Sequence, residues 1–240
     1  MKKLAIIIPL IAFMLIGCSS GTGYWGSGHV VSETRHVSGF DSVFLMTSGD
    51  LSIEQGDTES LTIEADDNLL KYLTSDIEGN TLKLSVENFV NLQYVTRIRY
   101  HLVVKNLEEV QLFGSGDIDA PELEADHMRI TILGSGSMVL DGLNAADLNV
   151  DLSGSGDLDI RGGTVDIQDI TLMGSGSYNA DDVESNQADV NVMGSGSVRI
   201  WVTDRLNATL MGSGDVEYFG DPSVDSSSLG SGDVVHLGNR

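Results

Sequence analysis

The tripeptide Gly-Ser-Gly occurs seven times between residue 114 and the end of this 240-residue sequence, and its spacing constrains the fold more than any other feature. The first Gly of each motif lies at 114, 134, 154, 174, 194, 212 and 230, so four intervals are 20 residues long and the last two are 18. A fixed period of this length is typical of proteins in which each repeat is one structural unit stacked on the next.

Apolar and polar residues alternate on both sides of each motif. With the first Gly as position 0, positions −4, −2, +4 and +6 are apolar or aromatic in 25 of 28 cases, and positions −5 and −3 are always polar. A period of two indicates half-buried strands. We therefore predict an all-β fold, a parallel β-helix of about 20-residue coils, with each strand paired to its copy one coil away. Both glycines of the motif are expected at positive φ, and the serines are expected to form a hydroxyl ladder.

The sequence before residue 108 departs from this regular pattern. Residues 43–53 fit the repeat template, with Thr47 in place of the first Gly, but residues 54–107 do not. For this stretch we predict strands over 60–65, 81–87 and 97–105, a short helix near 67–75 and a turn at 79–80. An open β-helix end exposes a sheet edge, so residues 54–107 are interpreted as a capping portion and 108–240 as regular coils. Ser226 and Ser228 mark the last coil as a solvated, terminal one.

The N-terminus has the features of a targeting segment. Two lysines precede an apolar run, Leu4 to Ile16, that is too short to span a membrane comfortably. The run ends in Leu15-Ile16-Gly17-Cys18, which resembles the lipobox of bacterial lipoproteins and implies cleavage before Cys18 and lipid attachment to its thiol. We predict a signal peptide over 1–17, a lipidated flexible tether over 18–36 and one domain over 37–240. A plain signal peptide, or an uncleaved anchor with an incidental Cys, is the alternative.

The composition excludes several kinds of partner. The chain carries 13 Lys+Arg and 36 Asp+Glu, a net charge of −23, which becomes 11 − 36 = −25 after cleavage. Such a polyanion repels phosphate backbones, so no nucleic-acid partner is expected, and acyl chains rather than charge would hold the protein on a membrane. The single Cys excludes an internal disulfide and a Cys-based zinc site.

The candidate binding residues are few. Asp117, Asp157, Asp215 and Asp233 follow the glycine corners and could offer oxygen ligands to calcium, or they could satisfy turn amides instead. Trp201 could stack on a sugar ring or serve in packing. The five His are scattered without metal-ligand spacing, and the best-placed cations, Arg161 and Arg199, occupy different columns of the repeat. We therefore predict no metal, no cofactor and no catalytic residues.

The order of several motifs resembles a known family. Gly39-Phe40-Asp41-Ser42-Val43, Ser48-Gly49-Asp50, Leu61-Thr62-Ile63-Glu64 and the later Gly-Ser-Gly-Asp repeats are similar to the bacterial family called "putative auto-transporter adhesin, head GIN domain". The resemblance covers about residues 37–236. It implies a right-handed parallel β-helix in envelope lipoproteins of Gram-negative bacteria, and it supplies no catalytic residues.

These observations lead to a functional hypothesis with two alternatives. We expect a lipid-anchored cell-envelope protein, on the outer membrane, with a non-enzymatic role in adhesion, scaffolding or binding of a surface glycan or envelope protein. The alternatives are a polysaccharide-active enzyme on the same scaffold and a periplasmic stress or assembly factor. The oligomeric state is left open.

Overall fold

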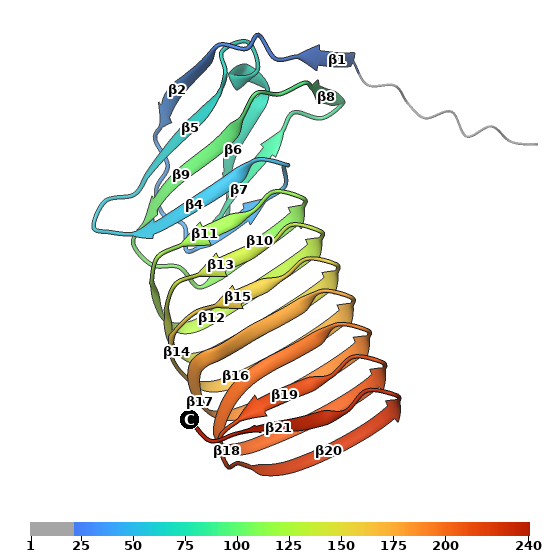
Figure 1. Cartoon of the computed structure of the whole chain (residues 1–240). Coiled ribbons are helices and arrows are strands. Elements are labelled where there is room, and N and C mark those ends of the chain that lie inside the picture. The colour runs from blue at the N-terminus through green and yellow to red at the C-terminus, as the bar shows by residue number, and fades with distance from the viewer. Residues whose placement is uncertain (1–21) are drawn as a thin grey trace, which may run out of the picture.

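A computed structural model describes residues 22–240, in which strands wind into a stack of parallel coils closed at one end by an irregular portion (Figure 1). The predicted all-β parallel β-helix is confirmed, and no α-helix occurs within residues 22–240. The predicted signal peptide over 1–17 and the lipidation site Cys18 lie outside the described residues. None of the helical structure in the described part is long and apolar enough to cross a membrane.

The regular coils begin at residue 109, and each coil contains one or two strands. Their strands are β10 (Glu109–Gly114), β11 (Ile118–Ala120), β12 (Leu123–Gly134), β13 (Met138–Leu140), β14 (Leu143–Gly154), β15 (Leu158–Ile160), β16 (Gly163–Gly174), β17 (Ser177–Gly194), β18 (Ser197–Gly212), β19 (Val216–Phe219), β20 (Ser223–Gly230) and β21 (Val234–Gly238). All pair in parallel with the next coil. Val110, Ile130 and Val150, for example, stand in one column.

The core of the solenoid consists of inward-facing side chains, which stack in columns from coil to coil. The apolar positions identified in the sequence are buried from the first coils to Val216, and they form one continuous cluster. Tyr178 is the largest side chain of this part of the core, and its hydroxyl donates a 2.7 Å hydrogen bond to Oε1 of the buried Gln168. Burying one aliphatic side chain stabilises a fold by about 1.5–3 kcal/mol. Every coil adds several such side chains to the inward columns, so these columns account for much of the stability.

The two glycines of each corner are required for different reasons. The first Gly lies at positive φ in all seven motifs, for example +134° at Gly174, as expected. The second Gly does not, which corrects the prediction for that position. A Cβ on Gly156 would lie 2.2 Å from the carbonyl oxygen of Gly136, so the second Gly is needed because adjacent coils approach too closely for a side chain. Between the two glycines of each corner lies a serine. The hydroxyl oxygens of two of these serines, Ser213 and Ser231, lie 3.1 Å apart.

The irregular portion caps the first coil with a mixed sheet. Its strands are β2 (Val30–Arg35), β3 (Ser42–Leu45), β4 (Asp50–Gln55), β5 (Ser60–Asp66), β6 (Leu73–Glu78), β7 (Thr81–Val86) and β9 (Ile98–Val104). β3 and β4 pair in parallel with β10 and β11, so residues 43–53 do form the first coil. β2, β5 and β9 pair antiparallel, as do β6 and β7. A separate two-stranded sheet of β1 (Thr22–Trp25) and β8 (Val90–Gln93) lies at the far end (Figure 1).

Two predictions for this portion are wrong. The helix near 67–75 is only a 3-10 turn, η1 (Leu70–Tyr72), because the following residues extend into β6 and pair with β7. No side chain caps that turn. The flexible tether over 18–36 is not observed for residues 22–35, since β1 and β2 are strands with defined partners. The predicted strands at 60–65, 81–87 and 97–105 and the turn at 79–80 are confirmed within one residue or so.

The opposite end of the stack is more polar. Every residue of β20 is exposed, including Ser226 and Ser228, so the last coil is solvated as predicted. The C-terminal residue Arg240 folds back onto the preceding coils. Its guanidinium lies 4.5 Å from the ring centroid of Phe219 and pairs with Asp181 and Asp182.

Candidate functional site

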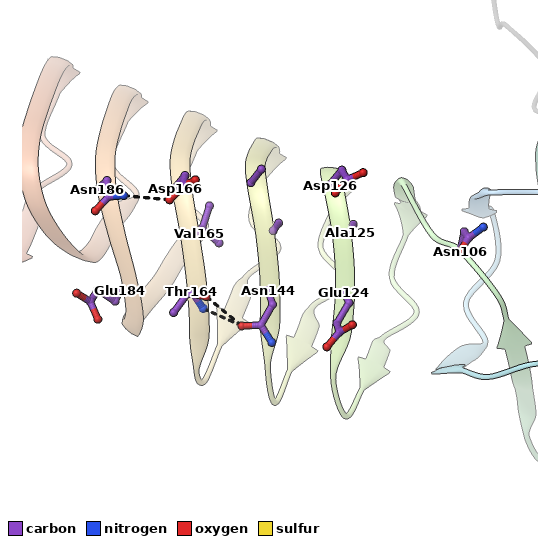
Figure 2. Close-up of a pocket in the computed structure, with 12 residues that line it drawn as sticks. Asn106, Glu124, Ala125, Asp126, Asn144, Thr164, Val165, Asp166, Glu184 and Asn186 are labelled. Carbon is purple, nitrogen blue, oxygen red and sulfur yellow. Dashed lines mark hydrogen bonds between the residues drawn. The ribbon is translucent and has the colours of Figure 1, made fainter.

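An open groove crosses four of the regular coils, with a volume of about 830 Å³. Two rows of side chains border it (Figure 2). The first row is Glu124, Asn144, Thr164 and Glu184, and the second row is Asp126, Ala146, Asp166 and Asn186. Asn106, from the segment that follows β9, lies at the end nearest the cap.

A change of phase in the long strands creates this groove. In β12 the buried positions run Leu123, then Met128, Ile130 and Ile132, so the alternation slips by one residue between 124 and 128. The parallel register skips Asp126 at the same place. Glu124 and Asp126 are both exposed because residues two apart point to the same face of a strand, and the slip leaves the next residue, His127, exposed as well. The floor between the two rows consists of small residues, Ala125, Ala145 and Val165.

Hydrogen bonds between coils hold both rows in place. In the first row, Oδ1 of Asn144 accepts from the backbone N–H and the hydroxyl of Thr164, each at 3.2 Å. In the second row, the amide of Asn186 donates to Oδ1 of Asp166 at 3.0 Å. The rows therefore present their remaining amide and carboxylate groups with a repeat of about 4.8 Å, the spacing between strands.

The chemistry of the lining is polar and acidic. Four carboxylates line the groove, at Glu124, Asp126, Asp166 and Glu184, and no Lys or Arg is among its lining residues. Carboxylates and amides together offer many acceptors and several donors, which suits hydroxyl-rich or cationic ligands. An anionic ligand would meet uncompensated negative charge.

The sequence-predicted Trp201 lies beside this groove. Its Cα pairs with Glu184 on one side and Phe219 on the other, so it continues the first row by one coil. Its indole is partly exposed, and its backbone carbonyl accepts a 2.7 Å hydrogen bond from the hydroxyl of Ser185. The structure therefore brings Trp201 next to the carboxylate at the end of the groove.

The four predicted aspartates form a separate column at the glycine corners. Oδ1 of Asp117 accepts from the N–H of Ser137 at 2.9 Å, and Oδ1 of Asp157 accepts from the N–H of Ser177 at 2.8 Å. Oδ1 of Asp215 accepts from the N–H of Asp233 at 2.9 Å. Three of these carboxylates thus satisfy backbone amides one coil away, which favours the turn-amide interpretation over calcium binding.

The remaining polar candidates are dispersed over the surface. Arg161 pairs with Asp159 and Asp141, at 3.0 and 3.1 Å, and these carboxylates raise the pKa of its guanidinium. Arg199 pairs with Glu217 in another column, 2.5 Å away. Across residues 22–240, no cluster of three or more His, Cys, Asp or Glu side chains is arranged to hold a metal ion.

The fold and the groove define a class, that of β-solenoids with an elongated polar groove. The chain belongs to the family described as "putative auto-transporter adhesin, head GIN domain", whose model matches residues 39–222. The resemblance noted from the sequence motifs is thereby confirmed. No curated protein matches the sequence.

Solved structures of the same fold include proteins from Parabacteroides and Bacteroides species. A "putative lipid binding protein" from Parabacteroides distasonis is 26% identical, with a TM-score of 0.75, covering 90% of this chain and all of the other. A "putative adhesin" from Bacteroides fragilis is 23% identical, with a TM-score of 0.84, covering 89% of this chain and all of the other. A second adhesin of that description, from Parabacteroides merdae, is 23% identical with a TM-score of 0.72, covering 90% and 99%.

Sequence reasoning missed every residue that lines the groove. The alternation of apolar and polar residues defines the strands only from −5 to +6 of each repeat. The residues of the two rows and of the floor lie beyond this range, at +10 to +12. The signal that could have found them is the small residue at +11, Ala125 and Ala145, between polar neighbours in consecutive coils. Small residues at a fixed place in a repeat indicate a position where large side chains do not fit.

Proposed function

We propose that this protein is a lipid-anchored, adhesin-type envelope protein that binds an extended, hydroxyl-rich polymer along the groove of its solenoid. The observation that carries the proposal is the pair of polar rows, which repeat at regular intervals over four coils. A polymer with a comparable repeat can make the same contacts in each coil, so weak individual hydrogen bonds add along its length. The membership of an adhesin family supports the same class of function.

The lining favours a neutral or amino-bearing glycan over the other ligands. The description of the Parabacteroides distasonis relative as lipid binding raises the question of an acyl chain. The floor of the groove offers only Ala and Val between two mainly polar rows, which is little apolar surface for such a ligand. Trp201, at the end of the first row, adds a partly exposed aromatic face on which a sugar ring can stack.

The proposal also includes the place of the protein in the cell. Cleavage before Cys18 and lipidation of its thiol would attach the chain to the outer membrane of a Gram-negative bacterium. Labelling with a radioactive or alkyne fatty acid should mark the wild-type chain and leave a Cys18→Ser variant unmarked. Protease treatment of intact cells should degrade the domain, and resistance to it would favour the periplasmic alternative.

Binding is tested with a panel of neutral, amino-bearing and anionic polysaccharides. Ala146 is exposed in the second row, so Ala146→Arg fills the groove without removing a core side chain. We expect this variant to lose at least about tenfold in affinity, equivalent to about 1.4 kcal/mol. Asn191→Arg, an exposed strand position outside the groove, adds the same charge and should bind as the wild type does.

Three results would contradict the proposal. They are an absence of binding to every polymer, a preference for anionic polymers, and equal losses in the two arginine variants. Release of new reducing ends from a bound polysaccharide would instead support the enzymatic alternative.

A further inference from the structure

A group of aromatic side chains lies exposed at the end of the molecule opposite the last coil. The group, called here the aromatic cluster, consists of Tyr24, Trp25, Tyr72, Phe89 and Tyr94. Trp25 is 58% exposed, Tyr94 is 76% exposed and Phe89 is 87% exposed. The cluster is carried by β1, η1 and the segments that flank β8, at the N-terminal end of the structure (Figure 1).

Ring contacts pair four members of the cluster, two by two. The rings of Trp25 and Tyr94 are stacked, with centroids 4.3 Å apart and planes 15° apart. The rings of Tyr24 and Tyr72 are also 4.3 Å apart, at 35°. Lys71 places its ammonium 4.8 Å from the centroid of Tyr72. Exposed apolar residues are ordinary when they are scattered singly, but several exposed aromatic side chains gathered at one end of a molecule are typical of an interaction surface.

The backbone holds two of these rings outward at an energetic cost. Phe89 has φ +67° and Tyr94 has φ +49°, and they are the only non-glycine residues with positive φ within residues 22–240. Each such conformation costs on the order of 1 kcal/mol or more in a bulky residue. Burial of the side chain offsets this cost for neither residue, so the fold alone does not explain the two backbone conformations. The strained conformations present these rings to solvent.

The support beneath the cluster is rigid. The buried carboxylate of Asp66 accepts hydrogen bonds from the N–H of Gly28 at 2.7 Å and from the N–H and hydroxyl of Thr96 at 2.8 and 2.9 Å. It thereby joins the segment that carries Trp25 to the one that carries Tyr94. The amide of Asn68 also donates to the carbonyl of Trp25 at 2.7 Å. The rings are therefore presented by a fixed platform.

The position of the cluster in the chain identifies what covers it. Trp25 is seven residues from Cys18, and a fully extended chain of that length reaches about 25 Å at most. Thr22, the start of β1, is only four residues from Cys18, a reach of about 14 Å. If Cys18 carries a lipid, as proposed above, this end of the solenoid cannot leave the neighbourhood of the bilayer surface.

We infer that the aromatic cluster docks into the headgroup region of a lipid bilayer and holds the solenoid in a fixed orientation on the membrane. Trp and Tyr favour the membrane–water interface, where one side of the ring is apolar and its polar edge stays hydrated. Phe89, the most exposed of the rings, provides apolar contact with the acyl boundary. Lys71 beside Tyr72 and the nearby Glu87 and Asp67 carry opposite charges, so the partner is a zwitterionic rather than a strongly anionic surface.

The two tryptophans of the chain allow this inference to be tested with the lipidated protein itself. In a Trp201→Phe background, Trp25 is the only tryptophan, and in a Trp25→Phe background only Trp201 remains. Both proteins are reconstituted into phosphatidylcholine vesicles that contain brominated lipid, which quenches emission from tryptophan within the bilayer. We expect strong quenching and a blue shift for Trp25, and several-fold less quenching for Trp201. Equal quenching in the two proteins would overturn the inference.

A second arm separates this inference from the proposed lipid anchor and from glycan binding. Residues 22–240 contain both sheets and the described core, so a chain that starts at Ser19 keeps them. This chain should bind weakly to phosphatidylcholine vesicles in a flotation assay, and Phe89→Ser should abolish the binding. Gln93→Ser, on the same short sheet, is the matched control and should float as the parent does. No flotation of the Ser19 chain, or equal flotation of the parent and Phe89→Ser, would overturn the docking inference. Failure of fatty-acid labelling would refute only the anchor.

Discussion

Replacing the second glycine of a corner with alanine tests the close approach of adjacent coils. In Gly156→Ala the new Cβ would lie 2.2 Å from the carbonyl oxygen of Gly136 and 2.8 Å from Cγ2 of Ile132. The N–H of Gly136 donates to the carbonyl oxygen of Gly114 at 3.1 Å, so Gly136 cannot move away without lengthening a hydrogen bond between coils. Overpacking of this kind costs about 1–3 kcal/mol, and the loss of chain entropy in the unfolded state returns about 0.4–1 kcal/mol. We expect a net destabilisation of about 1–1.5 kcal/mol.

The same coil provides a matched control. Gly162→Ala places its Cβ 3.6 Å from the carbonyl oxygen of Asp141, an ordinary contact, so this variant should be slightly stabilised. The two variants should differ by about 2 kcal/mol, or roughly 4–8 °C in melting temperature for a chain of this size. Circular dichroism in the strand region, followed through thermal and urea unfolding, measures the difference. Equal midpoints would refute the argument that coil contact demands the second glycine.

Three further changes test other parts of the structure. Tyr178→Phe leaves Oε1 of the buried Gln168 without its donor and should lower the free energy of unfolding by about 1–3 kcal/mol in urea titrations, whereas an unchanged midpoint would contradict the buried bond. Burial tends to raise the pKa of Asp66, but hydrogen bonds from Thr96 and Gly28 outweigh burial and lower that pKa. The ionised carboxylate therefore contributes stability above about pH 4, and this contribution is lost as the pH falls further. Asp66→Asn should therefore lower the melting temperature at pH 7 and flatten its dependence on pH below 4, and parallel pH curves for the two proteins would count against this. Finally, EDTA or calcium should shift the melting temperature by less than about 1 °C, because carboxylates such as Asp117 accept hydrogen bonds from backbone amides. A clear rise in the melting temperature with calcium would restore the metal-site interpretation.

The regular coils were predictable because their signal is repeated. Strict alternation around seven motifs identifies the inward columns, and the same columns are buried in the structure. The cap has no such repetition, and local spacing misled the prediction there. Leu69, Leu70 and Leu73 have helical spacing, but pairing with β7 draws Leu73 into a strand. Tertiary pairing outweighed local preference at that position.

The prediction of a flexible tether is wrong for a related reason. Residues 19–28 are rich in Ser and Gly, but the predicted tether continues to residue 36, beyond this composition. Val30 and Val31 begin a β-branched run that pairs with β5, so strand chemistry was present in the sequence. The groove could not be predicted in the same way, since it depends on where the long strands bend. That bend is a property of stacked coils rather than of one coil.

The direction of the hydrogen bonds between coils determines how the molecule carries force. These bonds run along the axis of the solenoid, from one strand to the next. Under the proposed arrangement, tension on a ligand held in the groove passes through β12 and β10 toward the anchored N-terminal end. At each step the bonds of a whole coil share the load, which resists rupture better than opening them one by one. The coils formed by β19 to β21 lie beyond Trp201 and outside this load path, and their contribution is to cover the edge of β18.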